Sequence, residues 1–168
     1  MKEKLLPSAV LTIVCAVVCG LLAAANAATH DKIVQAEADK VQKSLVRCFG
    51  EGTYTPLETA FEGVTAVYES TDGLQIYDIT ADGYSKGGIR ALIGIAQDGS
   101  IAGIGIVSCG ETAGVGTKIT DPAYLAQFDG ARTAEDFPDA ISRATFSSKG
   151  LQSAVSLALQ CAERRNDT

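Results

Sequence analysis

The sequence has few of the side chains that metal centres and hydrolytic active sites use. It contains one histidine, His30, and its five cysteines form no C-x-x-C pair and no Cys/His cluster. Zinc sites are built from such clusters, so we expect no metal site. We do not expect a Ser/His triad either, because His30 lies beside the apolar N-terminal segment.

Basic residues are fewer than acidic ones. The formal net charge is −6, and because the first 28 residues contribute +1, residues 29–168 carry −7. Nucleic-acid binding needs basic side chains against the phosphates, and adsorption to anionic lipid needs a polybasic segment. The composition therefore argues against nucleic acid as a partner and against a domain that lies on an anionic membrane surface.

A long uncharged segment stands near the start of the chain. Residues 8–28 are nearly all apolar or small, and Asn26 is the only amide among them. A helix of about 20 such residues spans a bilayer core. Lys2 and Lys4 precede the segment, so the positive-inside rule places the N-terminus in the cytoplasm. We expect a single-pass protein of the cell (inner) membrane.

Two other interpretations of this segment stay open. Ala25-Asn26-Ala27 has the A-x-A form of a signal-peptide cleavage site. A lipoprotein anchor at Cys19 is the weaker one, because Val18 is bulky where a small residue is usual. All of these interpretations place residues 29–168 outside the cytoplasm.

The exported part begins with a predicted helix and continues with predicted strands. Residues 31–47 have apolar residues near helical spacing and predict an amphipathic helix, whereas residues 49–63, with three glycines and a proline, predict a loop. Turns are predicted at Asp72-Gly73 and Asp98-Gly99. The β-type runs around them are residues 64–69, 74–81, 88–97 and 100–108.

Two helices are predicted after the strands. A short one opens at Asp121-Pro122, and a final one spans about residues 148–164. Its apolar face is formed by Leu151, Val155, Leu159 and Ala162. The predicted fold class is α+β, an antiparallel sheet domain flanked by helices. The segments are a cytoplasmic N-terminus (1–7), a transmembrane helix (8–28), a stalk helix (29–48) and an extracytoplasmic domain (49–168).

Glycines interrupt the predicted strands at Gly94, Gly103 and Gly105. A glycine inside a strand often marks the close approach of a backbone or a flat ligand. A bend in a strongly coiled sheet is the alternative.

The stretch ETAGVGTK, residues 111–118, is a candidate binding loop. Gly114 and Gly116 let the backbone turn sharply and face a ligand with its N–H groups. The P-loop spacing is absent, and no long helix follows at once as in a Rossmann phosphate turn. A plain surface loop is the alternative.

The stretch DAISRATFSSKG, residues 139–150, is the second candidate. We expect Ser147 or Ser148 to cap the final helix, whose first turn offers free N–H groups and the positive end of the helix dipole. Such a turn binds phosphate, and Lys149 adds a cation. The Thr145 hydroxyl lies close to this turn as an attachment point. A plain helix start is the alternative.

Together these motifs resemble one family. GYSKGGIRALIGIAQDGSIAGIGIV, then ETAGVGTK, then D-x-x-S-x-A-T before a final helix resembles the FMN-binding domain of the Rnf complex G subunit. The C subunit of the sodium-pumping NADH:quinone reductase shares this domain. The family's loop usually reads E-T-P-G-L-G-T-K, from which Ala113 and Val115 depart. The short chain favours the Rnf type over the longer C subunit.

The resemblance implies that FMN is bound covalently to Thr145 as a phosphoester. The family's flavinylation motif is D-x-x-(S/T)-G-A-T, and the positions that match it are Asp139, Ser142, Ala144 and Thr145. The resemblance further implies that Asp139 belongs to the motif that a flavin transferase reads. Besides Thr145, the implied cofactor-binding residues are Glu111, Thr112, Gly114, Gly116, Thr117, Lys118, Ser142, Arg143, Ala144 and Lys149. The flavin carries the redox chemistry, so no residue is expected to be catalytic.

Arg143 stands where the family usually has glycine. One interpretation is that glycine is needed there for its backbone angles or for access by the transferase, in which case attachment is slow or absent. The other is that the guanidinium pairs with the FMN phosphate. The sequence leaves both open.

The resemblance implies a membrane-anchored electron-transfer subunit of an ion-translocating ferredoxin:NAD+ oxidoreductase. Its implied partners are the other membrane subunits of the Rnf complex and a flavin transferase for maturation. Two alternatives are a stand-alone flavinylated surface protein for extracellular electron transfer and a non-redox exported binding module that has lost flavin.

Overall fold

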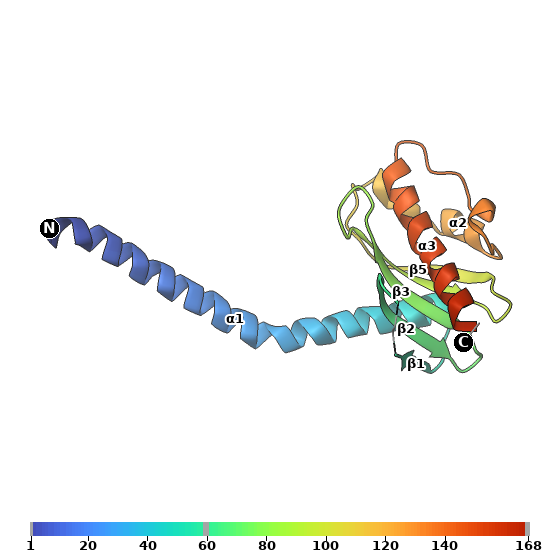
Figure 1. Ribbon diagram of the computed structural model, residues 1–168, viewed down its shortest axis with the longest axis horizontal. Coiled ribbons are helices and arrows are strands. Elements are labelled where there is room, and N and C mark those ends of the chain that lie inside the picture. The colour runs from blue at the N-terminus through green and yellow to red at the C-terminus, as the bar shows by residue number, and fades with distance from the viewer. Residues whose placement is uncertain (1, 59–60, 167–168) are drawn as a thin grey trace. The chain divides into compact units, whose positions relative to one another are not determined.

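The structure is a computed structural model that describes residues 2–58 and 61–166 (Figure 1). The chain divides into two compact units, Met1–Lys40 and Val41–Thr168. Helix α1 (Lys2–Phe49) makes up the first unit and contributes its last turns to the second.

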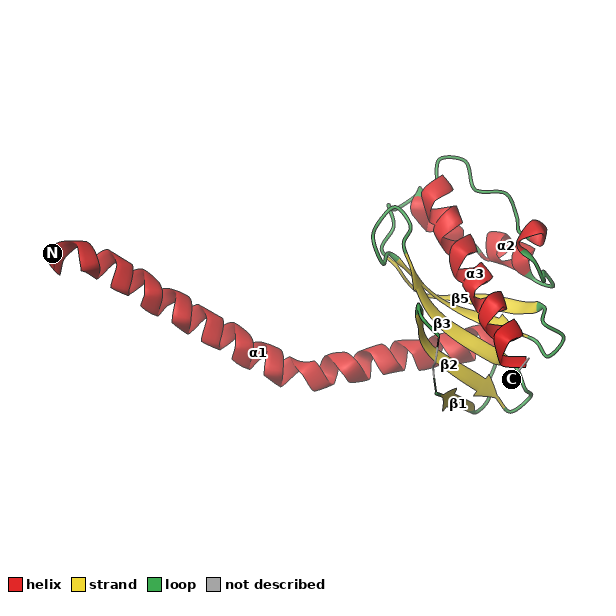
Figure 2. Cartoon of the chain, in the orientation of Figure 1, coloured by secondary structure: helices red, strands yellow, loops and turns green. Residues whose placement is uncertain are grey.

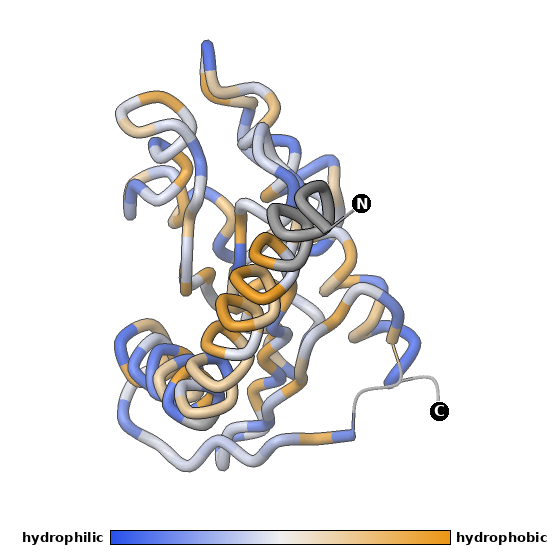
Figure 3. Tube along the Cα trace, turned by 90° about the vertical axis from the view of Figure 1, so that its left-hand side faces the viewer, coloured by the Kyte–Doolittle hydropathy of each residue, from blue (hydrophilic) through white to orange (hydrophobic). Residues whose placement is uncertain are grey.

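The first unit is an apolar helix whose described side chains are exposed. Between residues 10 and 40 none of them is buried, and an 18-residue window reaches a mean hydropathy of 2.3. The turns that follow the grey N-terminal end are largely hydrophobic in Figure 3. By length and composition α1 is suited to cross a membrane, and a signal sequence has the same properties.

The second unit is built on a five-stranded antiparallel sheet whose strands pair in sequence order. The strands are β1 (Tyr54–Leu57), β2 (Val64–Ser70), β3 (Gln75–Ala81), β4 (Ile89–Ile95) and β5 (Ile101–Cys109). The four predicted strands are confirmed as β2 to β5. The turn at Gly73 is closed by a 2.9 Å bond from its N–H to Ser70 O, and the turn at Gly99 by a 3.0 Å bond to Ala96 O.

Strand β1 corrects the prediction of a loop over residues 49–63. Tyr54 pairs with Ser70 and Leu57 with Val67 at the edge of the sheet. Pro56 has no N–H to donate, and an edge strand tolerates this because one side of it needs no partner. The glycines around these four residues and the proline among them favour a loop, so the strand was not predicted.

Both faces of the sheet in this unit are covered by helices. Helix α3 (Thr145–Asn166) packs against β3 and β4 on one face, as Figure 2 shows. Its buried residues include the whole predicted apolar face, Leu151, Val155, Leu159 and Ala162. On the other face, Val41 and Leu45 from the last turns of α1 pack against Ile76 and Leu92.

The glycines inside the strands make room for the end of α1. A Cβ atom on Gly94 would overlap the Phe49 ring, and one on Gly105 would lie 2.6 Å from Cys48 Sγ. The close approach that these glycines predict is therefore made by side chains of this chain, on the face of the sheet opposite α3.

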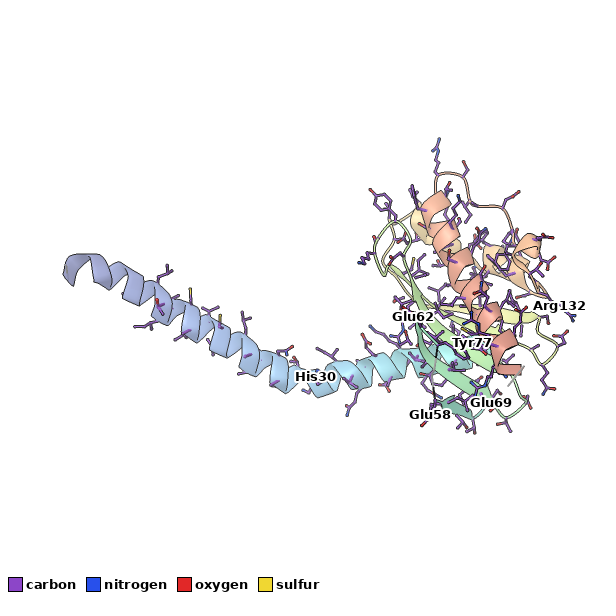
Figure 4. All side chains as sticks on the ribbon, viewed as in Figure 1. His30, Glu58, Glu62, Glu69, Tyr77 and Arg132 are labelled. Carbon is purple, nitrogen blue, oxygen red and sulfur yellow. The ribbon has the colours of Figure 1, made fainter. Side chains whose placement is uncertain are left out.

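Tyr77 of β3 lies beside the C-terminal half of α3 in Figure 4. It is fully buried, its hydroxyl donates a 2.7 Å bond to Gln75 Oε1, and burial raises its pKa to about 12. Cys161 of α3 is also buried, and burial raises the pKa of its thiol. All five cysteines are unpaired, and Cys161 packs as a small apolar core residue.

Short helices carry the chain from β5 to α3. They are η1 (Gly116–Thr120), α2 (Pro122–Leu125), η2 (Ala126–Phe128) and η3 (Ala134–Asp136). The predicted start at Asp121-Pro122 is confirmed, because Asp121 Oδ1 accepts a 2.9 Å bond from Ala123 N and caps α2. Tyr124 and Phe128 are buried and meet edge to face at 5.6 Å.

Candidate functional site

Three segments meet around the buried side chain of Glu111. They are the β3–β4 loop (residues 82–88), the β5–η1 loop (residues 110–115) and the first turn of α3. Glu111 is 6% exposed. Its carboxylate accepts bonds of 2.9 Å from Tyr84 N and 3.0 Å from Ser85 N, and a third bond from the Ser147 hydroxyl.

Glycines create the space that this carboxylate fills. A Cβ atom on Gly83 would lie 2.7 Å from Glu111 Oε1, and one on Gly88 2.5 Å from the same atom. A Cβ atom on Gly116 would lie 2.7 Å from Glu111 Cβ and from Ser147 Oγ. Gly150 lets α3 approach the β3–β4 loop, because a side chain there would overlap Asp82 O. Each of these glycines serves close packing around the three segments.

The surroundings of Glu111 favour its ionised form. Burial by itself would raise the pKa, but the Ser147 hydroxyl and the amides of Ser85 and Tyr84 together lower it below its usual value. A carboxylate that accepts several hydrogen bonds is stabilised in its charged state. The site therefore contains a fixed negative charge at neutral pH.

A cavity of about 140 Å³ is lined by two residues that donate hydrogen bonds to Glu111, Tyr84 and Ser147. We call it the site cavity, and its lining residues are Tyr84, Thr112, Val115, Gly116, Arg143, Ala144, Phe146 and Ser147. Tyr84, Phe146 and Val115 are 75%, 71% and 40% exposed. These three residues form an apolar rim. Among the described residues after α1, they are the large hydrophobic residues that are exposed.

Thr145 is the first residue of α3 and is exposed. Its neighbours Ala144 and Phe146 line the site cavity, although Thr145 itself does not. Within residues 2–58 and 61–166 no hydrogen bond involves its hydroxyl, and none involves the N–H groups of Thr145, Phe146 and Ser147. An exposed hydroxyl thus lies beside three free amides at the positive end of a 22-residue helix.

Arg143 has a left-handed backbone with φ of 69°, which no other non-glycine residue in the described chain shares. Glycine adopts this conformation without strain, which is a physical reason for the glycine of the family motif. Arg143 maintains the conformation in spite of its side chain. The turn ahead of Thr145 is therefore formed without glycine, and Arg143 lines the site cavity.

The predicted cap of the final helix is wrong. The helix begins at Thr145, three residues before the predicted start, so Ser147 and Ser148 lie inside it. Both are buried, Ser147 donating to Glu111 while Ser148 Oγ accepts a 3.0 Å bond from Ile141 N. Both serines therefore tie the first turn of α3 to the preceding chain.

The structure brings some of the predicted site residues together and leaves others apart. Thr112, Gly116, Arg143 and Ala144 line the site cavity, and Thr145 adjoins it. Glu111 lies behind the cavity wall, with its side chain held by other parts of the chain. The remaining predicted residues do not line the cavity, and these are Gly114, Thr117, Lys118, Ser142 and Lys149.

The residues outside the cavity have other surroundings. Thr117 Oγ1 accepts a 2.9 Å bond from Gly114 N and so holds the loop in shape. Lys149 borders an open groove of about 820 Å³ along α3, together with the motif residue Asp139. Another groove, of about 540 Å³, follows β5 and contains Cys48 and Cys109. It has no lining residue in common with the site cavity.

Sequence reasoning missed Tyr84, Phe146 and the partnership of Ser147 with Glu111. Tyr84 precedes a glycine pair and Phe146 follows Thr145, so both lie within recognised motifs. Their exposure depends on the meeting of loops distant in sequence, which no local pattern reveals.

Residues 83–160 match the family model of the FMN-binding domain. The FMN-binding domain match runs from the β3–β4 loop to α3 and thus includes Glu111, the site cavity and Thr145. A search of curated proteins found no match. The match supports FMN as the ligand of this part of the chain.

The residues at the site fit FMN. The free amides of α3 and the Arg143 guanidinium suit a phosphate, and the apolar rim suits a flat aromatic ring. Ligand pockets commonly have volumes of about 300–1,000 Å³, so a cavity of about 140 Å³ can enclose only part of such a cofactor. The rest of the ring would lie at the protein surface.

Proposed function

We propose that this chain is an extracytoplasmic electron carrier that holds FMN through a phosphoester bond to Thr145. The observation that carries the proposal is the position of this hydroxyl, exposed at the start of α3 beside three free amides and between two residues of the site cavity. The FMN-binding domain match over residues 83–160 supports the choice of cofactor.

The start of α3 would hold the phosphate. Its first-turn amides point away from the helix body and its dipole favours a negative group. Arg143 borders the same cavity and supplies a fixed positive charge with several donors. A covalent bond would keep the cofactor on an exported domain, where a dissociated flavin would be lost.

The apolar rim would hold the ring. Tyr84, Val115 and Phe146 exclude water from the face of the ring that they cover, while the uncovered part stays accessible to an electron-transfer partner. FMN, when bound, supplies the one- and two-electron chemistry. The chain's own residues position the cofactor, and none is required to move a proton.

We further propose that α1 anchors the chain in the cell membrane and that the chain is the G-type subunit of an Rnf complex. The length and hydropathy of α1 support the anchor. Lys2 and Lys4 ahead of the apolar segment support a cytoplasmic N-terminus. Purification of the tagged chain from its own host under mild detergent should bring down further membrane subunits. Recovery of the flavinylated chain alone would favour a stand-alone carrier.

The covalent bond is tested by mass spectrometry of the mature chain. Cleavage after Arg143 and Lys149 releases residues 144–149, and we expect this peptide to carry the mass of FMN less one water. Thr145→Ala should remove the adduct and the flavin fluorescence of the denatured protein band. Thr145→Ser should retain both, because it keeps a hydroxyl.

Thr71→Ala is the matched control for this experiment. It removes an equally exposed threonine on the β2–β3 turn, outside the site cavity. It should leave the adduct unchanged. A wild-type chain without any adduct, expressed with a flavin transferase, would overturn the proposed attachment.

A further inference from the structure

We propose that Glu111 is a positioning residue for the flavin, because its carboxylate ties together the three segments that form the walls of the site cavity. The inference rests on the proposed function, which it extends by assigning a role to a side chain that does not touch the cavity. Glu111 is absent from the cavity lining, while its partners Tyr84 and Ser147 and its neighbour Thr112 all belong to it.

The hydrogen bonds of Glu111 connect parts of the chain that are far apart in sequence. Tyr84 N and Ser85 N lie 27 and 26 residues before it, and Ser147 lies 36 residues after it. The loop with the rim residue Tyr84 is thus fixed to the helix turn that begins with Thr145. A second bridge supports the same junction, since Ser85 Oγ donates a 3.2 Å bond to Gly110 O.

A carboxylate suits this position better than an amide. The surrounding groups that face it, two N–H groups and one hydroxyl, all donate, and an ionised carboxylate has two oxygens that only accept. A glutamine would turn an NH₂ group toward at least one donor. Glu111→Gln should therefore loosen the junction although its side chain has nearly the same size.

The glycines show that the space is matched to this side chain. At Gly83 the three nearest atoms to an added Cβ all belong to the Glu111 carboxyl group, at 2.7 to 2.8 Å. The cost of Gly83→Ala should accordingly depend on Glu111. In a double-mutant cycle, Gly83→Ala should have little further effect once Glu111 has been replaced by alanine.

The negative charge of Glu111 also has an electrical consequence. Uptake of an electron by the flavin places new negative charge close to the site, which a nearby carboxylate disfavours. Removal of this charge should raise the midpoint potential of the bound flavin. A residue that served only to hold the fold together would not shift the potential in this direction.

The experiment uses the full chain in detergent, expressed with a flavin transferase, and compares Glu111→Gln with Asp78→Asn. Asp78 is the matched control because it is also a buried carboxylate, but it lies on β3 and is held by Arg90, away from the site cavity. We expect Glu111→Gln to slow FMN attachment about tenfold or more, as misplacement of reacting groups does, and to raise the midpoint potential of the flavin that is attached. Asp78→Asn should change neither quantity in the chains that fold.

Three further results make the test decisive. If Glu111→Gln attaches FMN at the wild-type rate and potential, the inference is wrong while the proposed function stands. If the wild type takes up no flavin, the proposed function fails, and hydrogen exchange at Tyr84 and Ser85 decides whether Glu111 still holds the loop. If Glu111→Gln does not fold, Ser147→Ala replaces it, because it removes one hydrogen bond to Glu111 and leaves the two amides in place.

Discussion

Two buried carboxylates, Asp78 and Glu111, are stabilised in different ways. Asp78 is fully buried within β3 and forms a two-bond ion pair with Arg90 of the adjacent strand, at 3.0 Å and 2.8 Å. Glu111 lies at the junction of loops and accepts from two amides and a hydroxyl, none of which has a positive charge. The first arrangement neutralises charge within a rigid sheet, and the second keeps a net negative charge beside the site cavity.

The two carboxylates therefore support different parts of the domain: the Asp78 pair supports the sheet, whereas the bonds of Glu111 support both the fold and the walls of the site cavity. The Asp78 pair lies between strands that hydrogen-bond along their length. The bonds of Glu111 connect segments that make no common secondary structure. Substitutions in the Asp78 pair should change only the free energy of unfolding. Substitutions at Glu111 should change the free energy of unfolding and also the attachment rate and midpoint potential of the flavin.

The largest expected effect on stability follows from Asp78→Asn. Asparagine is uncharged, so the substitution removes the attraction between the Asp78 carboxylate and the Arg90 guanidinium, and the loss of one charge from a buried pair costs about 3 to 5 kcal/mol. Because the Arg90 side chain is 21% exposed and water offsets part of the loss, we expect about 3 kcal/mol. Urea unfolding of the full chain in detergent measures it. An unchanged midpoint would contradict the importance of this pair.

A smaller loss is expected for Glu111→Gln. A buried donor that loses its acceptor lowers the free energy of unfolding by about 1 to 3 kcal/mol, and glutamine leaves at least one donor in this position, so we expect a loss of about 2 kcal/mol. The same urea titration measures it, with Glu69→Gln on the exposed part of β2 as the control. A loss equal to that of the control would show that the hydrogen bonds around Glu111 do not form in solution.

The stability difference between wild type and Glu111→Gln should depend on pH. The folded-state pKa of Glu111 is lowered, so its contribution is fully present above the pKa of an unfolded glutamate, about 4.3. It is lost as the pH falls through the folded-state pKa. The difference between the two unfolding free energies should therefore narrow below about pH 4. Hydrogen bonds also lower the pKa values of Asp98 and Asp136, but their contributions cancel because both proteins contain them. A difference that stayed constant down to pH 3 would count against an ionised Glu111.

The smallest effect is a gain, expected for Arg143→Gly. Glycine adopts the left-handed conformation of residue 143 without strain, which should raise the free energy of unfolding by about 1 to 2 kcal/mol. The larger backbone entropy of glycine in the unfolded chain lowers this gain by up to about 1 kcal/mol. The net stabilisation should be about 0.5 to 1 kcal/mol. Arg143→Ala keeps a Cβ atom and should give no gain. The two variants distinguish the effect of the backbone from that of the charge. Both remove the guanidinium and should weaken phosphate binding if it contributes, whereas only Arg143→Gly relieves the backbone strain.

Much of the fold could be predicted because it depends on local patterns. The Asp-Gly turns at residues 72–73 and 98–99 are short local motifs, and the apolar residues of α3 recur at helical spacing. Both predictions are confirmed. Strand β1 was missed because Gly50 and Gly52 precede it and Pro56 lies within it, and these residues are typical of loops, while the pairing of the strand depends on β2. The start of α3 was placed three residues late because Ser147 and Ser148 resemble capping residues.

The candidate site was predicted in part. The motifs located Thr145 and the two loops, and glycine at the family position of Arg143 pointed to an unusual backbone, which the structure shows. The role of Glu111 was beyond reach, because its partners lie 26 to 36 residues away and are two backbone amides and one serine among many. The exposure of Tyr84 and Phe146 likewise depends on how separate loops meet.

The apolar rim of the site cavity should affect the solubility of the domain. In the protein without a bound ligand, Tyr84, Val115 and Phe146 are all exposed to water. Clustered apolar side chains at a surface promote association with other molecules. Under the proposed function, the domain should therefore associate with other molecules more strongly before FMN is attached than afterwards, and attachment of the cofactor would also increase its solubility.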